Sequence, residues 1–298
     1  MTIGELARAA WFPFSDEPVL KKRWYLPRLG SPSVLSPGSS PDGKWHLFCQ
    51  SWIGIQHFLS SNGIAWHAAG RLSVMGTDPC VVPDMGRWYL FTARDGRRLC
   101  VHASEDLRSW GSATVVLEGE RNQVVGHPQP CKVGCQWRLY FSLGENELEG
   151  GRTIPLSVAV ASAPAVDGPY RNPQMVIAAD ADDPAINMGV GPCSVLSCQD
   201  GFGLIASSAH WNRSKVGSGS SLVLFLSQDG IHFGQPRQLL SNPESGWASG
   251  FFTGTSCICK GDERSWYCYY AAIDRAPIPS GSIGLFLGRD VQNPLLMD

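Results

Sequence analysis

A pattern of short strand-like runs that recurs five times along the 298-residue chain most constrains its fold. Each copy has a short opening run beside Gly or Pro, an aromatic run after a Gly/Asp turn, and an apolar run that enters another turn. The opening runs align on Pro32, Pro79, Pro128, Pro192 and Thr255. Their spacing of roughly 47 to 64 residues matches propeller blades, with enlarged loops in two copies. The repeat predicts an all-β, five-bladed β-propeller.

The fifth copy ends near Asp290, too early to supply an outer strand of its own. The N-terminal run Val19–Leu26 has strand character and no other blade to join. We therefore predict that this run closes the ring, which would remove two exposed sheet edges. The chain is then a single domain, residues 1–298, in which residues 1–28 supply the closing strand.

The composition agrees with one all-β domain. The chain holds 33 glycines, 21 prolines and 11 tryptophans, and no long stretch has apolar residues at helical spacing. Hydrophobic residues make up 43% and charged residues 17%, so the chain can bury a large core.

Charge and hydropathy exclude two classes of partner. Lys and Arg number 24 against 26 Asp and Glu, with no dense basic stripe, so we expect no nucleic-acid partner. No apolar run approaches the roughly 20 residues that span a bilayer, so we expect no membrane insertion. Glu5 and Arg8 stand where a signal peptide would be apolar, which predicts a cytoplasmic protein.

The 10 cysteines form no Cys-x-x-Cys motif and no Cys/His cluster of the zinc type. Most stand inside apolar runs such as Trp266–Tyr270, where a thiol behaves as a small hydrophobic group. This pattern predicts buried free thiols rather than disulfides or metal ligands, as in a reducing compartment. We expect no cofactor and no metal, and the sequence offers no acidic cage for calcium.

The propeller geometry nominates one face as the site. Strands within a blade run antiparallel, so the start of the first strand and the loop after the second emerge on the same face. The first-strand starts there are Ser31, Asp78, His127 and the stretch Met188–Gly191. The loops add Trp52, Arg94, Asp95, Glu145, Glu147, His210, Trp211, Asp274 and Arg275.

Residues 28–290 resemble glycoside hydrolase family 43 and its five-bladed relatives. The resemblance is carried by the X-Pro opening strands, by second strands such as Lys44–Phe48 and Arg87–Phe91, and by the phrase Ala161–Tyr170. It implies a carbohydrate-active protein that holds a glycoside or other small molecule in an axial funnel.

The family's catalytic carboxylates have no counterpart here. The resemblance implies an Asp base opening blade one, an Asp opening blade three and a Glu acid opening blade four. These positions hold Ser31, His127 and either Val190 or Gly191. Inverting hydrolysis needs two carboxyl groups across the sugar. Either the protein binds without cleaving, or its acid and base come from elsewhere on the same face.

The leading acid/base candidates are Asp78 and His127, with Glu145 next. A carboxylate near the axis is desolvated, and an imidazole there can transfer protons near neutral pH. Asp78 could instead only accept hydrogen bonds from strand amides, and His127 could be a satisfied core histidine. Glu145 and Glu147 belong to the acidic loop Ser142–Gly151, which would otherwise be a solvated run.

The remaining candidates would bind the ligand. Trp52 and His210–Trp211 offer flat rings for stacking on a sugar, with core packing as the alternative. Arg94–Asp95 and Asp274–Arg275 could clamp a polar or anionic substrate, or form surface ion pairs of little energetic weight.

Three hypotheses about function follow. The first is a glycoside-binding protein that cleaves by a non-standard acid/base set. The second is a repurposed biosynthetic enzyme that acts on a small non-glycan metabolite by proton transfer, elimination or cyclisation. The third is a non-catalytic pseudo-glycosidase that binds a glycan, and fold alone does not separate them.

The ring-closure hypothesis predicts that deleting residues 1–28 destabilises the whole propeller, because two sheet edges would become exposed. The melting temperature of the truncated chain should fall well below that of the full chain. An unchanged melting temperature would contradict the hypothesis.

Overall fold

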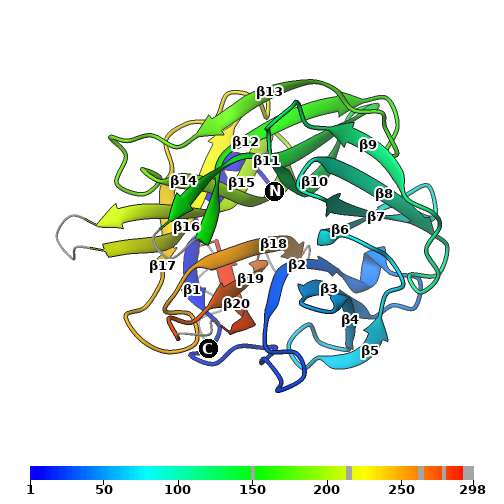
Figure 1. Cartoon of the computed structure of the whole chain (residues 1–298), viewed down its shortest axis with the longest axis horizontal. Helices are drawn as coiled ribbons and strands as arrows, with labels where there is room; N and C mark the ends of the chain where they lie inside the picture. The colour runs from blue at the N-terminus through cyan, green and yellow to red at the C-terminus, as the bar shows by residue number, and fades with distance from the viewer. Residues whose placement is uncertain (149–151, 213–216, 261–264, 277–279, 291–298) are drawn as a thin grey trace.

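The structure is a computed structural model that describes residues 1–148, 152–212, 217–260, 265–276 and 280–290. It confirms an all-β, five-bladed propeller, in which five four-stranded antiparallel sheets surround a common axis (Figure 1). A short helix, α1 (Ile3–Arg8), precedes the strands, and a 3-10 turn, η1 (Pro37–Ser39), follows β2.

The first four blades each use four consecutive strands. Blade I is β2 (Leu29–Leu35), β3 (Trp45–Ser51), β4 (Gly54–Ser60) and β5 (His67–Arg71). Blade II is β6 (Thr77–Asp84), β7 (Arg87–Arg94), β8 (Arg98–Ser104) and β9 (Thr114–Glu118). Blade III is β10 (Val125–Val133), β11 (Gln136–Leu148), β12 (Arg152–Ala163) and β13 (Arg171–Ala178). Blade IV is β14 (Gly189–Cys198), β15 (Gly201–Asn212), β16 (Gly217–Ser227) and β17 (Arg237–Ser241).

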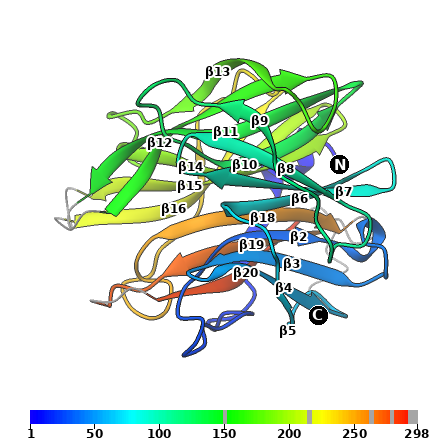
Figure 2. The same cartoon turned by 45° about the vertical axis from the view of Figure 1, so that its right-hand side comes forward.

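Blade V joins the two ends of the chain. Its strands are β18 (Phe252–Lys260), β19 (Ser265–Ile273), β20 (Gly281–Arg289) and, on the outside, β1 (Ala10–Pro13). Blade V packs between blades IV and I, where β18 lies beside β14 and β2 (Figure 2).

The N-terminal segment closes the ring as predicted, but through different residues. The strand that pairs with β20 is β1, and the predicted run Val19–Leu26 makes only isolated bridges, such as Leu20 to Ile283. Leu20 and Leu26 are instead buried in the core between blades V and I. The strand-like pattern of this run therefore reflects core packing, and not a place in the sheet.

Aromatic stacking holds β1 in place. The Trp11 ring lies 5.9 Å from the ring of Trp266 and 5.6 Å from that of Phe286, measured between centroids. Leu6 of α1 is fully buried in the same apolar cluster. Offset aromatic pairs of this kind contribute about 1 kcal/mol each beyond their buried area.

The second strand of each blade fills the core, as its aromatic pattern predicts. Phe48, Phe91, Tyr140 and Tyr269 all lie on second strands and are fully buried. Several cysteines share this interior, and burial raises the thiol pKa of both Cys80 and Cys193 to about 12. The part of the chain that the structure describes contains no helix long and apolar enough to cross a membrane.

Blade I contains two buried histidines, His46 and His57, linked to the exposed carboxylate of Asp42. His46 Nε2 lies 2.8 Å from Asp42 Oδ1, and His46 Nδ1 lies 2.9 Å from His57 Nε2. The His57 ring also stacks on Phe48, with centroids 4.4 Å apart. Burial, followed by the charges of His46 and Arg108, lowers the pKa of His57 to about 4. The fold therefore holds His57 in its neutral form.

This network predicts a loss of stability in acid. His57 binds a proton near pH 6.5 in the unfolded chain but only near pH 4 in the folded one, so protons favour unfolding between these values. The effect amounts to about 3 kcal/mol. His57→Gln keeps a hydrogen-bonding side chain that does not titrate. The free energy of unfolding, measured with denaturant, should therefore fall less between pH 6.5 and 4 in this variant than in wild type. An equal fall in both proteins would contradict the role given to His57.

Candidate functional site

The first strand of every blade carries the same backbone irregularity at the axis. The strand register slips at one point in each blade, and a residue with positive φ stands there. The five residues are Ser31 (φ 43°), Asp78 (52°), His127 (49°), Gly191 (111°) and Gly254 (155°). A bulge of this kind re-aims the side chain at its own position. The repeat therefore presents three side chains and two glycines to the centre of the ring.

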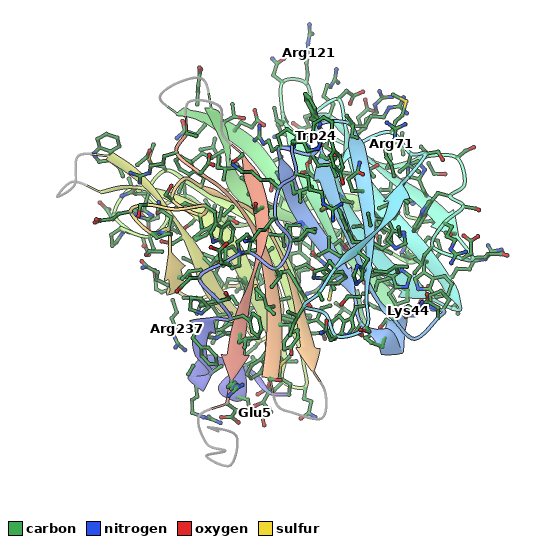
Figure 3. All side chains as sticks on the ribbon, turned by 90° about the horizontal axis from the view of Figure 1, so that it is seen from below. Glu5, Trp24, Lys44, Arg71, Arg121 and Arg237 are labelled. Carbon is green, nitrogen blue, oxygen red and sulfur yellow. The ribbon has the colours of Figure 1, made fainter. Side chains whose placement is uncertain are left out.

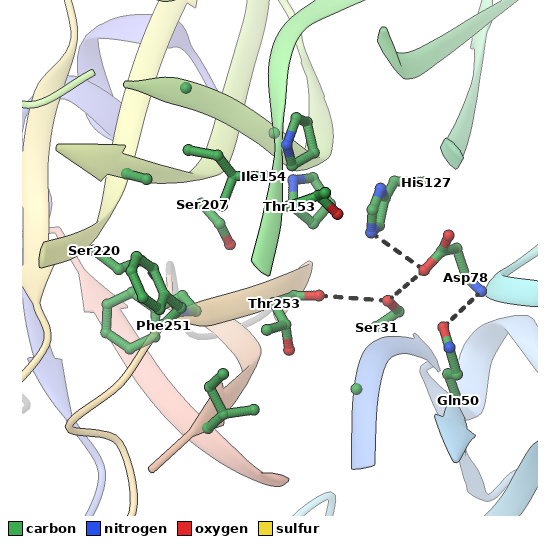
Figure 4. A pocket seen from close by; sticks show the side chains of 18 of the residues that line it. Ser31, Gln50, Asp78, His127, Thr153, Ile154, Ser207, Ser220, Phe251 and Thr253 are labelled. Atoms are coloured by element: carbon green, nitrogen blue, oxygen red, sulfur yellow. Dashed lines mark hydrogen bonds and ion pairs between the residues drawn. The ribbon is translucent and has the colours of Figure 1, made fainter. Parts of the chain in front are cut away.

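The three side chains contact one another across blades I, II and III. Ser31 Oγ donates a hydrogen bond of 2.8 Å to Asp78 Oδ1, and His127 Nε2 lies 3.2 Å from the same oxygen (Figure 4). Thr77 Oγ1 lies 3.3 Å from the other carboxylate oxygen, and Gln50 Oε1 accepts from the Asp78 amide at 3.2 Å. Asp78 is thus a well-partnered carboxylate at the centre of a polar group.

The backbone at Ser31, Asp78 and His127 is strained, which reduces the stability of the fold. Left-handed φ costs a non-glycine residue about 1 to 2 kcal/mol, and here three such residues occupy equivalent positions. Strain of this kind persists where the surrounding structure enforces it, and it clusters at functional sites. A Cβ added to Gly191 in blade IV would lie only 2.9 Å from Ser142 Oγ. A Cβ added to Gly254 in blade V would lie 2.7 Å from Ser31 Cα. Close packing therefore requires glycine there.

A cavity of about 590 Å³ opens above this group, and all five blades contribute to its wall. Its size is within the usual range for small-molecule sites. Side chains that line it include Arg28, Gln50, Ser51, Trp52, Thr153, Ile154, Ser207, Ser208, Ser220, Phe251 and Thr253, besides Ser31, Asp78 and His127 (Figure 4). The wall is thus rich in hydroxyl groups. Ser207 Oγ is buried without a hydrogen-bond partner among the described residues.

A smaller cavity of about 150 Å³ adjoins the first and shares Asp78 and His127 with it. Glu145, an exposed residue of β11, lines this smaller cavity. The three acid/base candidates from the sequence therefore line one connected region. Glu147 is also exposed but lines neither cavity, and it pairs with Thr153 in the β11–β12 hairpin.

The two ring nitrogens of His127 have different surroundings. Nε2 points to Asp78, and Nδ1 is buried without a hydrogen-bond partner among the described residues. The His127 side chain is 25% exposed and that of Asp78 is 13% exposed, so both remain reachable from the cavity. A carboxylate beside an imidazole orients the ring and can hold or pass one proton.

Trp52 lies at the rim of the cavity with its side chain largely exposed. Its indole Nε1 donates to the Tyr25 carbonyl at 3.3 Å, which anchors the ring while leaving a face open. The position agrees with the stacking role that the sequence suggests.

The two charge pairs from the sequence lie outside both cavities. Asp95 pairs with Arg98 rather than Arg94, and the hydrogen bond from Arg98 lowers the pKa of Asp95. Asp274 accepts from the Ser280 amide at 3.0 Å, and Arg275 Nε donates to the Ser249 carbonyl at 2.8 Å. Asp95 and Asp274 thus bond within their own turns, and Arg275 and Lys22 tie the second turn to distant segments.

His210 and Trp211 follow the three residues of β15 that line the larger cavity. The His210 ring lies against Gly219 on the neighbouring strand, and burial lowers its pKa. The Trp211 amide donates to Asn187 Oδ1 at 2.7 Å. Neither residue lines the cavity, although Ser207–Ala209 just before them do.

Sequence reasoning missed several lining residues, including Arg28, Gln50, Thr153, Ser207 and Thr253. The rule that nominated the site considered only strand starts and the loops after second strands. Gln50 and Ser207 belong to the second strands themselves, and Thr153 begins a third strand. Adjacent polar residues inside apolar strands, such as Ser207–Ser208, were the signal that could have found part of this set.

Metal ligands are not grouped in the described part of the chain. No cluster of three or more His, Cys, Asp or Glu side chains there could hold an ion.

Solved structures match this fold over nearly the whole chain. A family 62 α-L-arabinofuranosidase domain from Coprinopsis cinerea is 12% identical, with a TM-score of 0.66 over 96% of this chain and 97% of that one. An N-acetylgalactosamine deacetylase from F. plautii, solved with blood group B trisaccharide, is 12% identical, with a TM-score of 0.71 over 94% and 95%. An α-L-arabinanase from Cellvibrio cellulosa, solved with arabinohexaose, is 14% identical, with a TM-score of 0.62 over 87% and 91%. No family model and no curated protein matches the sequence.

This is the fold of family 43 and family 62 glycoside hydrolases. At these identities the likeness concerns the fold, while activity depends on the residues in the cavity. The repeated bulge places Gly191 at the position in blade IV that Ser31, Asp78 and His127 hold in blades I to III. The two-carboxylate set that the family resemblance implies is therefore absent from Ser31, His127 and Gly191.

The left-handed backbone at His127 predicts an unusual order of stability between two variants. His127→Gly should be more stable than His127→Ala by about 1 kcal/mol, because only glycine adopts this φ without strain. Thermal or urea unfolding of both proteins measures the difference. The same pair of substitutions at exposed His67 on β5, where φ is not positive, should show the opposite order, and alanine as the more stable residue at both positions would contradict the strain argument.

Proposed function

We propose that the protein is carbohydrate-active, with a saccharide bound in the axial cavity and with Asp78 and His127 as its acid/base pair. The observation that carries the proposal is the 3.2 Å approach of His127 Nε2 to Asp78 Oδ1 on the wall of a cavity of about 590 Å³. The fold match to glycosidases and to a deacetylase supports the same class of ligand.

The cavity wall suits a ligand that carries many hydroxyl groups. Ser51, Ser207, Ser208 and Ser220 line it. The hydroxyls of Ser51, Ser208 and Ser220 donate to protein carbonyl oxygens at 2.7, 3.3 and 2.8 Å, which leaves a serine oxygen to accept hydrogen bonds. Trp52 adds an aromatic face at the rim. Sugars present hydroxyl groups at their edges and C–H groups on their ring faces, so this combination favours a saccharide over an apolar metabolite.

The proposed chemistry differs from ordinary inverting hydrolysis. That mechanism uses two carboxyl groups separated by about 6.5 to 9.5 Å, whereas Asp78 is the one carboxylate among the residues lining the larger cavity. In our proposal His127 gives or takes the proton at the substrate. Asp78 orients the imidazole and balances its charge, and Ser31 holds Asp78 through its 2.8 Å hydrogen bond.

One observation favours a second candidate, a glycan-binding protein without turnover. Asp78 already has Ser31, Thr77 and His127 as partners, as a structural carboxylate would. In this case the same cavity binds the saccharide, and the polar group maintains the shape of its floor.

A substrate panel tests the proposal. The purified protein is incubated with aryl glycosides, acetylated amino sugars and short oligosaccharides, and product release is measured for wild type, Asp78→Asn and His127→Ala. Loss of acid/base catalysis should lower turnover by at least about 100-fold in both variants. The control variants Glu105→Gln and His67→Ala change exposed side chains outside both cavities and should retain wild-type rates.

Each result decides between the two candidates. Wild-type rates in Asp78→Asn and His127→Ala would eliminate the acid/base assignment. Saccharide binding without turnover in wild type would favour the glycan-binding protein, and the absence of both binding and turnover across the panel would overturn the carbohydrate proposal.

A further inference from the structure

Arg28 stands out among the basic residues of the N-terminal segment. Its three basic neighbours are engaged within the protein: Lys21 with Glu17 at 3.0 Å, Lys22 with Asp274 at 3.4 Å, and Arg23 with the Tyr25 hydroxyl at 2.6 Å. The side chain of Arg28 has no ion pair or hydrogen bond among the described residues, and it lines the larger cavity. Its charge is therefore open to a ligand.

The backbone fixes where Arg28 stands. A bridge to Gly281 holds the residue immediately before β2, and the next residue, Leu29, pairs with Ser51 of β3. This register sets Arg28 opposite Trp52 at the rim of the cavity. Figure 3 shows Trp24, Arg71 and Arg121 toward the same side of the disc, away from Glu5 and Lys44.

The described wall of the larger cavity carries two opposite charges, on Arg28 and Asp78, which do not pair with each other. Asp78 is the carboxylate among the lining residues, and it already contacts Ser31 and His127. Nothing on the described wall neutralises the guanidinium of Arg28. A guanidinium without a protein partner can bind carboxylate or sulfate oxygens through two parallel hydrogen bonds.

We infer that the cavity takes an anionic saccharide, with its acidic group on Arg28 and its ring against Trp52. The inference rests on the proposed function and names its class of substrate. Arg28 and Trp52 face each other across the first two strands of blade I, so one sugar unit can reach both. Hexuronates and sulfated sugars both carry the anionic group that this pair recognises.

Matched ligands isolate the contribution of that charge. Galacturonate, glucuronate and mannuronate oligosaccharides are each compared by calorimetry with their methyl esters, which keep the sugar ring but lose the carboxylate charge. A sulfated oligosaccharide, beside its desulfated form, distinguishes sulfate from carboxylate as the group recognised. At least one acidic ligand should bind at least about tenfold more tightly than its neutral counterpart, and added salt should reduce the difference.

Variants assign the preference to Arg28. Arg28→Gln should remove the difference in affinity between acid and ester, mainly by weakening the binding of the acid. Arg28→Lys keeps the charge but not the planar fork, so it should retain part of the preference. Arg121→Gln is the matched control, because this arginine is exposed and does not line the cavity, and the full preference should remain.

The outcomes separate this inference from the proposed function. Equal binding of acid and neutral forms, with neutral saccharides still bound, would overturn the anionic preference and leave the carbohydrate proposal standing. Loss of the preference in Arg121→Gln but not in Arg28→Gln would move the anion site elsewhere on this face and overturn the assignment to Arg28. If no saccharide of either kind binds, the carbohydrate proposal itself fails, and this inference with it.

Discussion

Pairing of β1 with β20 is the contact on which the rest of the molecule depends. A ring of blades built from consecutive strands would end with an unpaired edge on blade V, and an exposed edge invites pairing with another chain. The first residues of the chain cover that edge, and Trp11 stacks on the sheet it completes. This contact brings the two ends of the chain into one blade. Blade V lines the axial cavity through its inner strands, with Phe252 and Thr253 of β18 and Ile273 of β19.

The second constraint is the bulge that every first strand carries at the axis. Five strands converge there, and the positive φ of each bulge residue turns its side chain out of the regular alternation. In blades IV and V the space is so close that glycine is required, whereas blades I to III carry Ser31, Asp78 and His127. One backbone device thus serves both packing and function. It also makes the cavity floor asymmetric, because blades I to III present polar side chains there and blades IV and V present glycines.

Much of the site could be predicted from local sequence. Ser31, Asp78 and His127 each stand before the proline that opens a blade, and the antiparallel order of strands places all such residues on one face. The same rule also nominated Asp274, Arg275, Arg94 and Asp95, which line neither cavity, and the hydrogen bonds that Asp274, Arg275 and Asp95 make instead are not revealed by sequence spacing. It also nominated Val19–Leu26 as the closing strand. Apolar residues buried between blades and apolar residues in a sheet give the same pattern, so Leu20 and Leu26 could not be told apart from strand residues.

Local sequence was sufficient to specify the recurring strands and turns of the five repeats and the residues that open each blade, because alternation and turn chemistry act over a few neighbouring residues. Only the closed ring decided which of these residues meet. Ser31 and Asp78 are 47 positions apart, yet one hydrogen bond joins them. Arg28 is far in sequence from most of the wall it shares with Ser207 and Thr253. Such contacts depend on the angle between blades and on the close packing of first strands around the axis, and no local segment encodes either.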